Sequence, residues 1–147
     1  FVVIPHQFRI HIVLIVVCIF IIIFPILSER PDAQKAEKAT AAAMEFLHLI
    51  DAEKYAESWQ IAADLMKEKV NKQEWIEQLT RARTLSGALE ERSEEEVSYS
   101  TTAKDSPDGE YISLTFASKY QRTESVTEFV TVMLEDGHWK VAGYFIQ

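Results

Sequence analysis

The sequence is poor in the residues that mark several common kinds of active site. It contains one cysteine, Cys18, so it can form no internal disulfide. Its four glycines form no phosphate-binding loop, and no serine or cysteine stands in a nucleophile motif. The four histidines include no pair with the spacing of metal ligands on one helix or strand. We therefore expect a protein with no cofactor and no metal, and the sequence favours a non-enzymatic role.

Positive charge is also scarce. Of the 15 Lys and Arg residues only Arg9 precedes Ser28, so the rest of the chain holds 14 basic residues against all 23 acidic ones, a net charge of −9. Such an acidic surface disfavours binding to nucleic acid and direct adhesion to anionic lipid.

A long apolar run stands out near the start of the chain. The residues from Ile10 to Leu27 include no formal charge, and as a helix they would span about 27 Å, close to the thickness of a bilayer's hydrocarbon core. We predict that residues 1–28 form a membrane anchor. A cleaved signal peptide is the alternative, with a poor cleavage site after the run. One basic residue precedes the run and three follow it closely, which does not favour a cytoplasmic N-terminus.

The segment after the run predicts a hinge and then a helix. Pro31 interrupts helices, so residues 29–35 are expected to form the hinge. From Ala36 to Ile50 the apolar residues recur at steps of three and four, which is typical of a helix with one buried face. The expected buried residues of this helix are Ala36, Ala39, Ala43, Phe46, Leu47 and Ile50.

Two more helices are predicted before the pattern changes. Asp51 is a suitable N-cap for a second helix that continues to Met66. A third helix is expected to begin at Asn71, with Glu74 three residues later as in a capping box, and to end near Gly87.

Beyond Gly87 the apolar pattern has a period of two, which predicts strands. A first strand is placed only loosely, within Leu89 to Thr102, and its segment EERSEEE is expected to be too charged for burial. A Pro-Asp-Gly turn leads into a second strand over Ile112 to Tyr120. The third strand is predicted from Val126 to Glu135, and Asp136-Gly137 is a typical hairpin turn into a fourth.

The fourth strand carries apolar residues on both faces. Strict alternation places one set on one face, Trp139, Val141, Gly143 and Phe145, and the other set on the opposite face, Lys140, Ala142, Tyr144 and Ile146. Residues 36–147 therefore predict one soluble α+β domain, with three helices packed on a four-stranded antiparallel sheet.

Three stretches, FLHLIDAEKYAESWQIAA, PDGEYISLTF and TEFVTVMLEDGHWKVAGYFI, together with Trp75, Leu79 and Arg83, resemble one bacterial family. It is the domain-of-unknown-function 4019 family. The similarity runs from about Ala36 to Ile146. It implies the cone-shaped fold of nuclear-transport-factor-two-like and cystatin-like domains. Members usually carry an export signal, so the resemblance implies a periplasmic domain, but it implies no reaction.

Glu128 is the candidate for chemistry inside such a cone. If it is buried among the apolar residues of the third strand, its pKa could rise toward the range of a general base, with His48 as a partner. The alternative is a carboxylate that is solvated or paired with Arg122 or Lys119 near the end of the strand.

Aromatic residues offer two further hypotheses. Tyr55, Trp59 and Tyr111 could line a ligand cavity with Glu128 and His48, although aromatics at such spacing usually form ordinary core. Apolar residues expected on the outer sheet face could instead bind a partner protein, and they are Phe129, Met133, Tyr144 and Ile146.

The leading functional hypothesis is a membrane-anchored, non-enzymatic accessory or scaffold subunit of a larger membrane assembly. Its partners would be other membrane protein subunits, and its location would be the bacterial inner membrane with the domain in the periplasm. The alternative is a periplasmic module that binds a small ligand, or an unrecognised enzyme, with an apolar pocket inside the cone.

Overall fold

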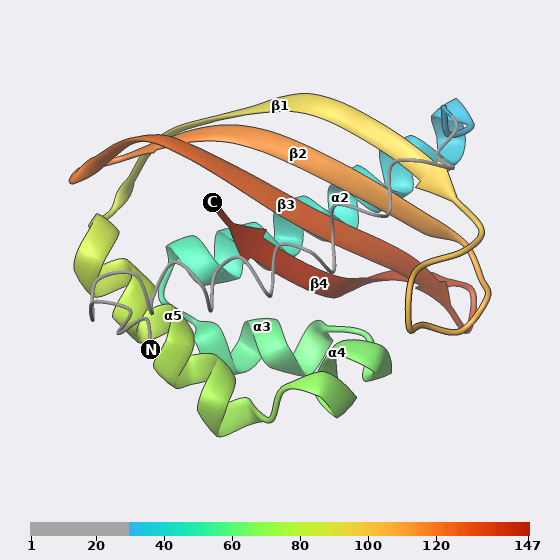
Figure 1. The fold of residues 1–147 in the computed structure, drawn as a ribbon, viewed down its shortest axis with the longest axis horizontal. Helices are drawn as coiled ribbons and strands as arrows, with labels where there is room; N and C mark the ends of the chain where they lie inside the picture. The colour runs from blue at the N-terminus through green and yellow to red at the C-terminus, as the bar shows by residue number, and fades with distance from the viewer. Residues whose placement is uncertain (1–29) are drawn as a thin grey trace, which may run out of the picture.

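The computed structural model describes residues 30–147, which form four helices and one sheet (Figure 1). The helices are α2 (Ala33–Asp51), α3 (Tyr55–Ile61), α4 (Asp64–Lys69) and α5 (Lys72–Ser86). The strands are β1 (Leu89–Ser100), β2 (Tyr111–Tyr120), β3 (Thr123–Glu135) and β4 (His138–Ile146). The predicted anchor at residues 1–28 lies outside the described residues, and no helix within residues 30–147 is long and apolar enough to cross a membrane.

The four strands pair in chain order, and every pair is antiparallel. Helix α2 runs along one face of the curved sheet, and α3, α4 and α5 gather on the side of β4 (Figure 1). We call the face that packs against α2 the inner face and the opposite one the outer face. The predicted α+β class and the antiparallel sheet are confirmed.

Helix α2 begins three residues earlier than its apolar pattern indicates. Asp32 caps it, because its carboxylate accepts a hydrogen bond from the backbone N–H of Lys35 at 3.4 Å. The buried face contains five of the six predicted residues, Ala39, Ala43, Phe46, Leu47 and Ile50, whereas Ala36 is only half-buried. The two alanines of this stripe allow the helix to lie close to the strands.

The prediction of one continuous second helix is wrong. The chain turns extended at Ala62 and Ala63, which separates α3 from α4. Two contacts from the sheet hold this break: the N–H of Ala63 donates to the carbonyl of Val141 at 2.8 Å, and the carboxylate of Glu135 accepts from the N–H of Asp64 at 2.9 Å. Alanine is a strong helix former, so the break comes from tertiary hydrogen bonds and not from local preference.

Helix α5 has both predicted ends. Asn71 and Glu74 form a reciprocal capping box at its start. Gly87 follows its last residue with φ of 77°, a conformation that glycine adopts without strain. A Cβ atom at this position would also lie 2.9 Å from the Cβ of Gln121.

Strand β1 contains the whole glutamate-rich segment EERSEEE, whose side chains we expected to be exposed. The strand runs for 12 residues, and its five glutamates are exposed as expected, whereas the side chain of Arg92 is only 5% exposed. The expectation that EERSEEE is too charged for burial is therefore wrong at Arg92, because its guanidinium finds carboxylate partners inside the domain.

A β-bulge in β4 changes the predicted faces of the last residues. Thr131 of β3 pairs with Gly143, whereas the next residue, Val132, pairs with Val141, so Ala142 has no partner. The extra residue moves Tyr144 and Ile146 to the inner face, opposite Val130 and Glu128, and leaves Phe145 on the outer face opposite Phe129. The prediction that Tyr144 and Ile146 share the outer face with Phe129 and Met133 is wrong for this reason.

The core between α2, α5 and the inner face contains a cluster of three aromatic rings. The ring of Phe46 lies 5.9 Å from that of Trp75 and 5.9 Å from that of Tyr144, and the last two are 6.2 Å apart. These separations are typical of favourable edge-to-face packing. The indole N–H of Trp75 donates to the hydroxyl of Ser58 at 3.0 Å, so its polar atom is satisfied within the core.

Candidate functional site

Glu128 is fully buried on the inner face, where it meets an arginine that the sequence did not single out. Arg92 reaches across from β1 and donates through Nε to Oε1 of Glu128 at 2.8 Å and through Nη2 to Oε2 at 3.2 Å. Glu128 is 0% exposed, so this is a two-point ion pair in the interior. Ser118 and Tyr144 each donate their hydroxyl to the same carboxylate.

The other end of the Arg92 guanidinium binds Asp51 in the last turn of α2. Nη1 lies 2.7 Å from Oδ2 of Asp51, and Nη2 lies 3.0 Å from Oδ1. Nη2 also contacts the hydroxyl of Tyr120 at 3.3 Å. We call these six residues the Arg92 network: Asp51, Arg92, Ser118, Tyr120, Glu128 and Tyr144. It connects the end of α2 with all four strands.

The contacts of the network shift the pKa values of Glu128, Tyr120 and Tyr144. Burial by itself raises the pKa of Glu128. The hydrogen bonds and charge of Arg92, together with the hydrogen bonds from Ser118 and Tyr144, outweigh burial and bring this pKa below its usual value. Burial and the charge of Glu128 raise the pKa of Tyr120 to about 12 and that of Tyr144 well above its usual value. Glu128 is therefore a carboxylate, Arg92 a guanidinium and both tyrosines are neutral.

This arrangement leaves Glu128 little capacity for acid–base chemistry. Each carboxylate oxygen accepts two hydrogen bonds, one from Arg92 and one from a hydroxyl. A general base needs a free lone pair and a pKa close to neutrality, whereas the surroundings of Glu128 lower its pKa. Both sequence hypotheses for Glu128 are corrected: it is neither a buried base with a raised pKa nor paired with Arg122 or Lys119.

The lowered pKa of Glu128 predicts how this residue contributes to stability at different pH. A group whose pKa is depressed by folding stabilises the protein above its unfolded pKa, about 4.3 for glutamate, and this contribution is lost as the pH falls through the folded pKa. We expect Glu128→Gln to be destabilising at neutral pH, with a difference from the parent chain that shrinks below about pH 4. Urea unfolding of both chains over a series of pH values measures this difference in the free energy of unfolding.

The matched control for this experiment is Glu124→Gln, at an exposed position of the same strand. Its effect on the free energy of unfolding should be small at every pH. The free energies of unfolding of Glu128→Gln and the parent chain could instead differ by the same amount from neutral to acid pH. That result would contradict the predicted ionisation of Glu128.

The remaining predicted ligand residues do not converge on Glu128. His48 is exposed on α2 and borders a shallow surface cavity of about 500 Å³ with Met44 and Leu49. Trp59 donates its indole N–H to the carbonyl of Val70 at 2.9 Å, which ties α3 to the segment after α4. The Trp59 contact is that of a packing residue, and His48 is a surface residue.

Tyr55 and Tyr111 are also separate from Glu128 in their contacts. Tyr111 is on the outer face, since it pairs with Met133, and its hydroxyl donates to the carbonyl of Pro107. Tyr55 belongs to the core, and within residues 30–147 its hydroxyl is the one buried side-chain polar atom that has no hydrogen-bond partner. The described residues therefore do not assemble the five predicted positions into one pocket.

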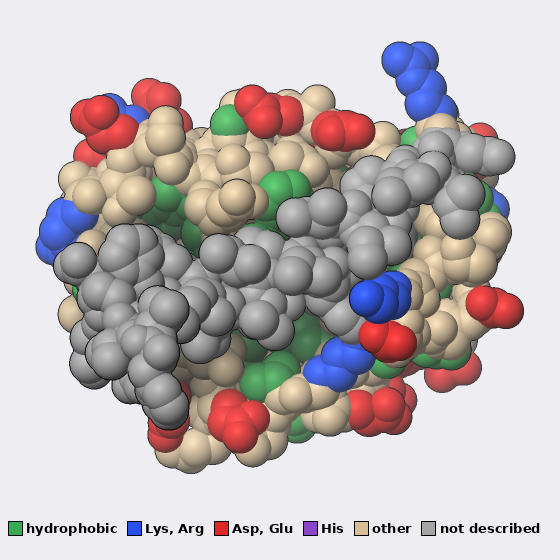
Figure 2. Space-filling model, in the orientation of Figure 1, with side chains coloured by type: hydrophobic (Ala, Val, Ile, Leu, Met, Phe, Trp, Pro, Cys, Tyr) green, Lys and Arg blue, Asp and Glu red, His purple; other side chains and the backbone are tan. Residues whose placement is uncertain are grey.

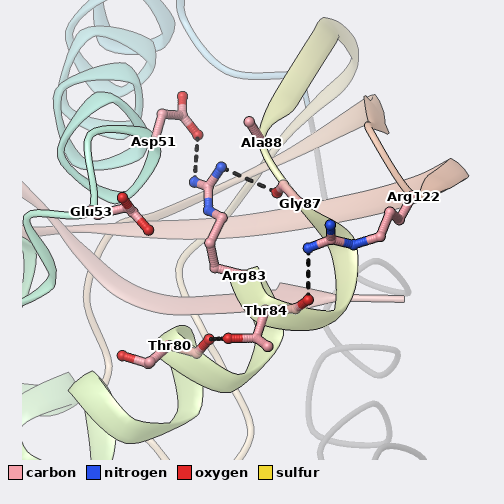
Figure 3. A pocket seen from close by; sticks show the side chains of 8 residues that line it. All are labelled: Asp51, Glu53, Thr80, Arg83, Thr84, Gly87, Ala88 and Arg122. Carbon is pink, nitrogen blue, oxygen red and sulfur yellow. Dashed lines mark hydrogen bonds and ion pairs between the residues drawn. The ribbon is translucent and has the colours of Figure 1, made fainter.

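A cavity of about 420 Å³ opens beside the Arg92 network, at the end of α2 (Figure 3). Asp51 and Arg83 line it together, and Arg122 borders it from the turn between β2 and β3. Arg83 donates to the carbonyls of Ile50 at 3.0 Å and Gly87 at 3.3 Å, and Arg122 donates to that of Thr84 at 2.8 Å. Both guanidinium groups thus hold helix ends together, as the dashed contacts in Figure 3 illustrate for Gly87 and Thr84.

The model of the family described as "Protein of unknown function (DUF4019)" matches residues 42–144. The chain belongs to the DUF4019 family. The resemblance seen in the sequence is therefore confirmed, and the helices and four-stranded antiparallel sheet agree with the fold expected for it. The DUF4019 region extends from the middle of α2 into β4 and includes all six residues of the Arg92 network. No curated protein matches the chain.

Sequence reasoning missed Arg92, the residue that organises the site. One signal was present: Arg92 is the single basic residue among the glutamates of its segment, which suggests a specific partner. Identifying that partner as Glu128 requires the pairing of β1, β2 and β3, which brings Arg92 opposite Ser118 and Glu128 opposite Phe116.

Proposed function

We propose that this DUF4019 chain is a membrane-anchored, non-enzymatic accessory or scaffold subunit of a larger membrane protein assembly. In this proposal the apolar run from Ile10 to Leu27 anchors it in the bacterial inner membrane, and residues 30–147 lie on the periplasmic side. The domain acts by binding other subunits, without a cofactor.

The observation that carries the non-enzymatic part is the saturation of Glu128. This residue is the buried carboxylate that a catalytic cone would need as a base, yet Arg92, Ser118 and Tyr144 occupy both of its oxygens. The aromatic cluster of Phe46, Trp75 and Tyr144 fills the adjacent space. An interior of this kind supports a rigid binding domain better than an active site.

The outer face of the sheet supplies the surface for a partner. Phe129 and Phe145 stack there, with ring centroids 5.9 Å apart and planes at 28°, and Met133 is on the same face. Phe145 is buried, with 6% of its surface exposed, whereas Phe129 and Met133 are half-buried. Aromatic side chains and methionine are enriched in the centres of protein interfaces. We therefore propose that the partner contacts Phe129 and Met133, with the buried Phe145 supporting the ring of Phe129 from beside it.

The experiment is to extract the full chain from membranes in a mild detergent and to identify the chains that co-purify with it. We expect a defined membrane protein partner that Phe129→Asp removes, because a charge on the stacked pair opposes burial of that surface. The matched control is Gln73→Asp, at an exposed position in the first turn of α5 where an acidic residue suits the helix dipole.

Retention of the partner by Gln73→Asp and its loss in Phe129→Asp would support the proposal. A lone monomer would count against it, as would a partner that both variants retain. Thermal unfolding of the two purified variants checks that both are folded.

A small-ligand-binding module or an enzyme ranks second. The observation in its favour is the cavity of about 420 Å³ at Asp51, Arg83 and Arg122. A ligand there would compete with the hydrogen bonds that the two arginines make to helix carbonyls, which is why we prefer the binding domain.

A further inference from the structure

Helices α3 and α4 lie on a segment whose sequence suits one continuous helix. Residues 55–69 contain no glycine or proline, and the break falls at Ala62 and Ala63, which are strong helix formers. The chain nevertheless turns between the two helices (Figure 1). Conflicts of this kind between local preference and the whole fold are expected at functional or strained sites.

The break is confined to two backbone angles. Ala62 has φ of −67° and ψ of 160°, and Ala63 has φ of −64° and ψ of 152°. Both φ values are those of an α-helix, in which ψ is about −42°. Rotation about two ψ angles therefore separates the observed form from a straight helix, and neither alanine has a side chain beyond Cβ to hinder it. Protein hinges consist of a few residues that absorb such a change.

In the observed form two backbone donors at the break bind the sheet. The N–H of Ala63 donates to the carbonyl of Val141 at 2.8 Å, and that of Asp64 donates to the carboxylate of Glu135 at 2.9 Å. In a straight helix the same two donors would bind carbonyls four residues earlier, within α3. The two forms exchange tertiary hydrogen bonds for helical ones, and neither form leaves these donors unpaired.

Side chains complete this exchange on the acceptor side. The carbonyl of Gln60, which a straight helix would pair with Asp64, accepts instead from Nζ of Lys67 at 2.7 Å. Glu135 is itself held by Nζ of Lys140 at 3.0 Å, and its side chain is only 15% exposed. The carboxylate of Glu135 is therefore a fixed side-chain contact that keeps the start of α4 against the sheet.

Movement of α4 would remove little apolar surface from the core. The helix has six residues and buries one side chain, that of Met66. The two alanines are also buried, but each contributes only a methyl group. Charged side chains of both signs lie in the part of Figure 2 where α4 is found, as its sequence DLMKEK indicates. Short elements with few buried contacts open at a lower free energy than the whole domain.

We infer that Ala62 and Ala63 form a hinge, and that α4 is a strap held closed by Glu135 which opens by straightening into one helix over residues 55–69. The structure is the closed form, in which the strap covers the edge of β4 at Val141. In the open form this carbonyl loses its donor and Met66 leaves the core. The open form is a minor state, of about 0.1–10%. The hinge does not depend on the proposed membrane anchoring.

The test follows the full chain in detergent micelles by NMR relaxation dispersion and saturation transfer, which detect minor states on the μs–ms timescale. The Cα chemical shifts of both hinge alanines in the minor state distinguish a helix from an unfolded chain. Glu135→Gln replaces a charged acceptor by a neutral one, and we expect it to raise the population of a helical minor state about tenfold. Glu68→Gln, at an exposed position of α4, is the matched control and should leave this population unchanged.

A second variant, Asp64→Pro, separates straightening from simple melting of α4. Proline suits the first position of α4, because the residue before it is extended. The same proline would disrupt a straight helix over residues 55–69. Asp64→Pro also removes the N–H that Glu135 accepts, yet it should abolish the helical minor state.

Helical shifts at both alanines in a minor state that Glu135→Gln enriches and Asp64→Pro removes would support the hinge. A minor state with the shifts of an unfolded chain would mean that α4 melts, and the hinge would be wrong. It would also be wrong if neither the parent chain nor Glu135→Gln showed a minor state, or if Glu135→Gln and Glu68→Gln had equal effects.

Discussion

A chain in which Arg92 is replaced by methionine is expected to lose about 3–5 kcal/mol of its free energy of unfolding. Arg92 is the counter-ion of Glu128, a residue that is 0% exposed, and without it a carboxylate remains buried with only two hydroxyl donors. Asp51 loses its bidentate partner in the same step. Urea unfolding at neutral pH gives the difference.

The control is Lys119→Met, which removes an ion pair with Glu90 in which both side chains are more than 40% exposed. Exposed pairs contribute about 0–1 kcal/mol, so this variant should be close to the parent chain. The double variant Arg92→Met/Glu128→Gln removes both charges and should recover part of the loss. Equal effects of Arg92→Met and Lys119→Met would show that the Arg92 network does not stabilise the fold.

The second large effect is expected at Phe46. Its side chain is 0% exposed and contacts both Trp75 and Tyr144, so Phe46→Ala removes the centre of the aromatic cluster. Substitutions of this type reduce the free energy of unfolding by about 3–5 kcal/mol. The exposed Leu85, at 73%, provides the control, and Leu85→Ala should stay within about 0.5 kcal/mol of the parent chain.

Phe46→Ala also tests whether this ring fills the interior beside Tyr144. An apolar cavity of this size can admit a small apolar molecule such as benzene. We expect benzene to raise the melting temperature of Phe46→Ala and to leave that of the parent chain unchanged. A similar rise in the parent chain would instead point to an existing cavity and favour the ligand-binding alternative.

The parts of the fold that local pattern controls could be predicted from the sequence. The buried stripe of α2, the capping box of α5 and the hairpin turn before β4 follow from spacing and from the preferences of single residue types. The family resemblance also came from sequence alone, and the matched region confirms it.

The features that were missed depend on contacts between distant segments. The break at Ala62 and Ala63 is held by Val141 and Glu135, some 70 or more residues later in the chain. Gly143 beside Ala142 is a typical sign of a bend in a strand, but the bulge itself, which reverses the side on which Tyr144 lies, is defined only by the pairing with β3. Arg92 looked like part of a solvated run because its carboxylate partners come from α2 and β3.

The break between α3 and α4 and the glutamates of β1 both affect whether a further strand can pair with the edges of this sheet. Among the described strands β1 and β4 are at the margins, where unpaired backbone groups could recruit a further strand from another molecule. At β4 the carbonyl of Val141 is already taken by Ala63, and the bulge distorts the hydrogen-bonding row. At β1 a neighbouring copy would align like charges. Both edge strands therefore oppose the addition of a strand from another molecule and the growth of fibres. Specific assembly is then expected to use the faces of the domain instead of the edges of its sheet.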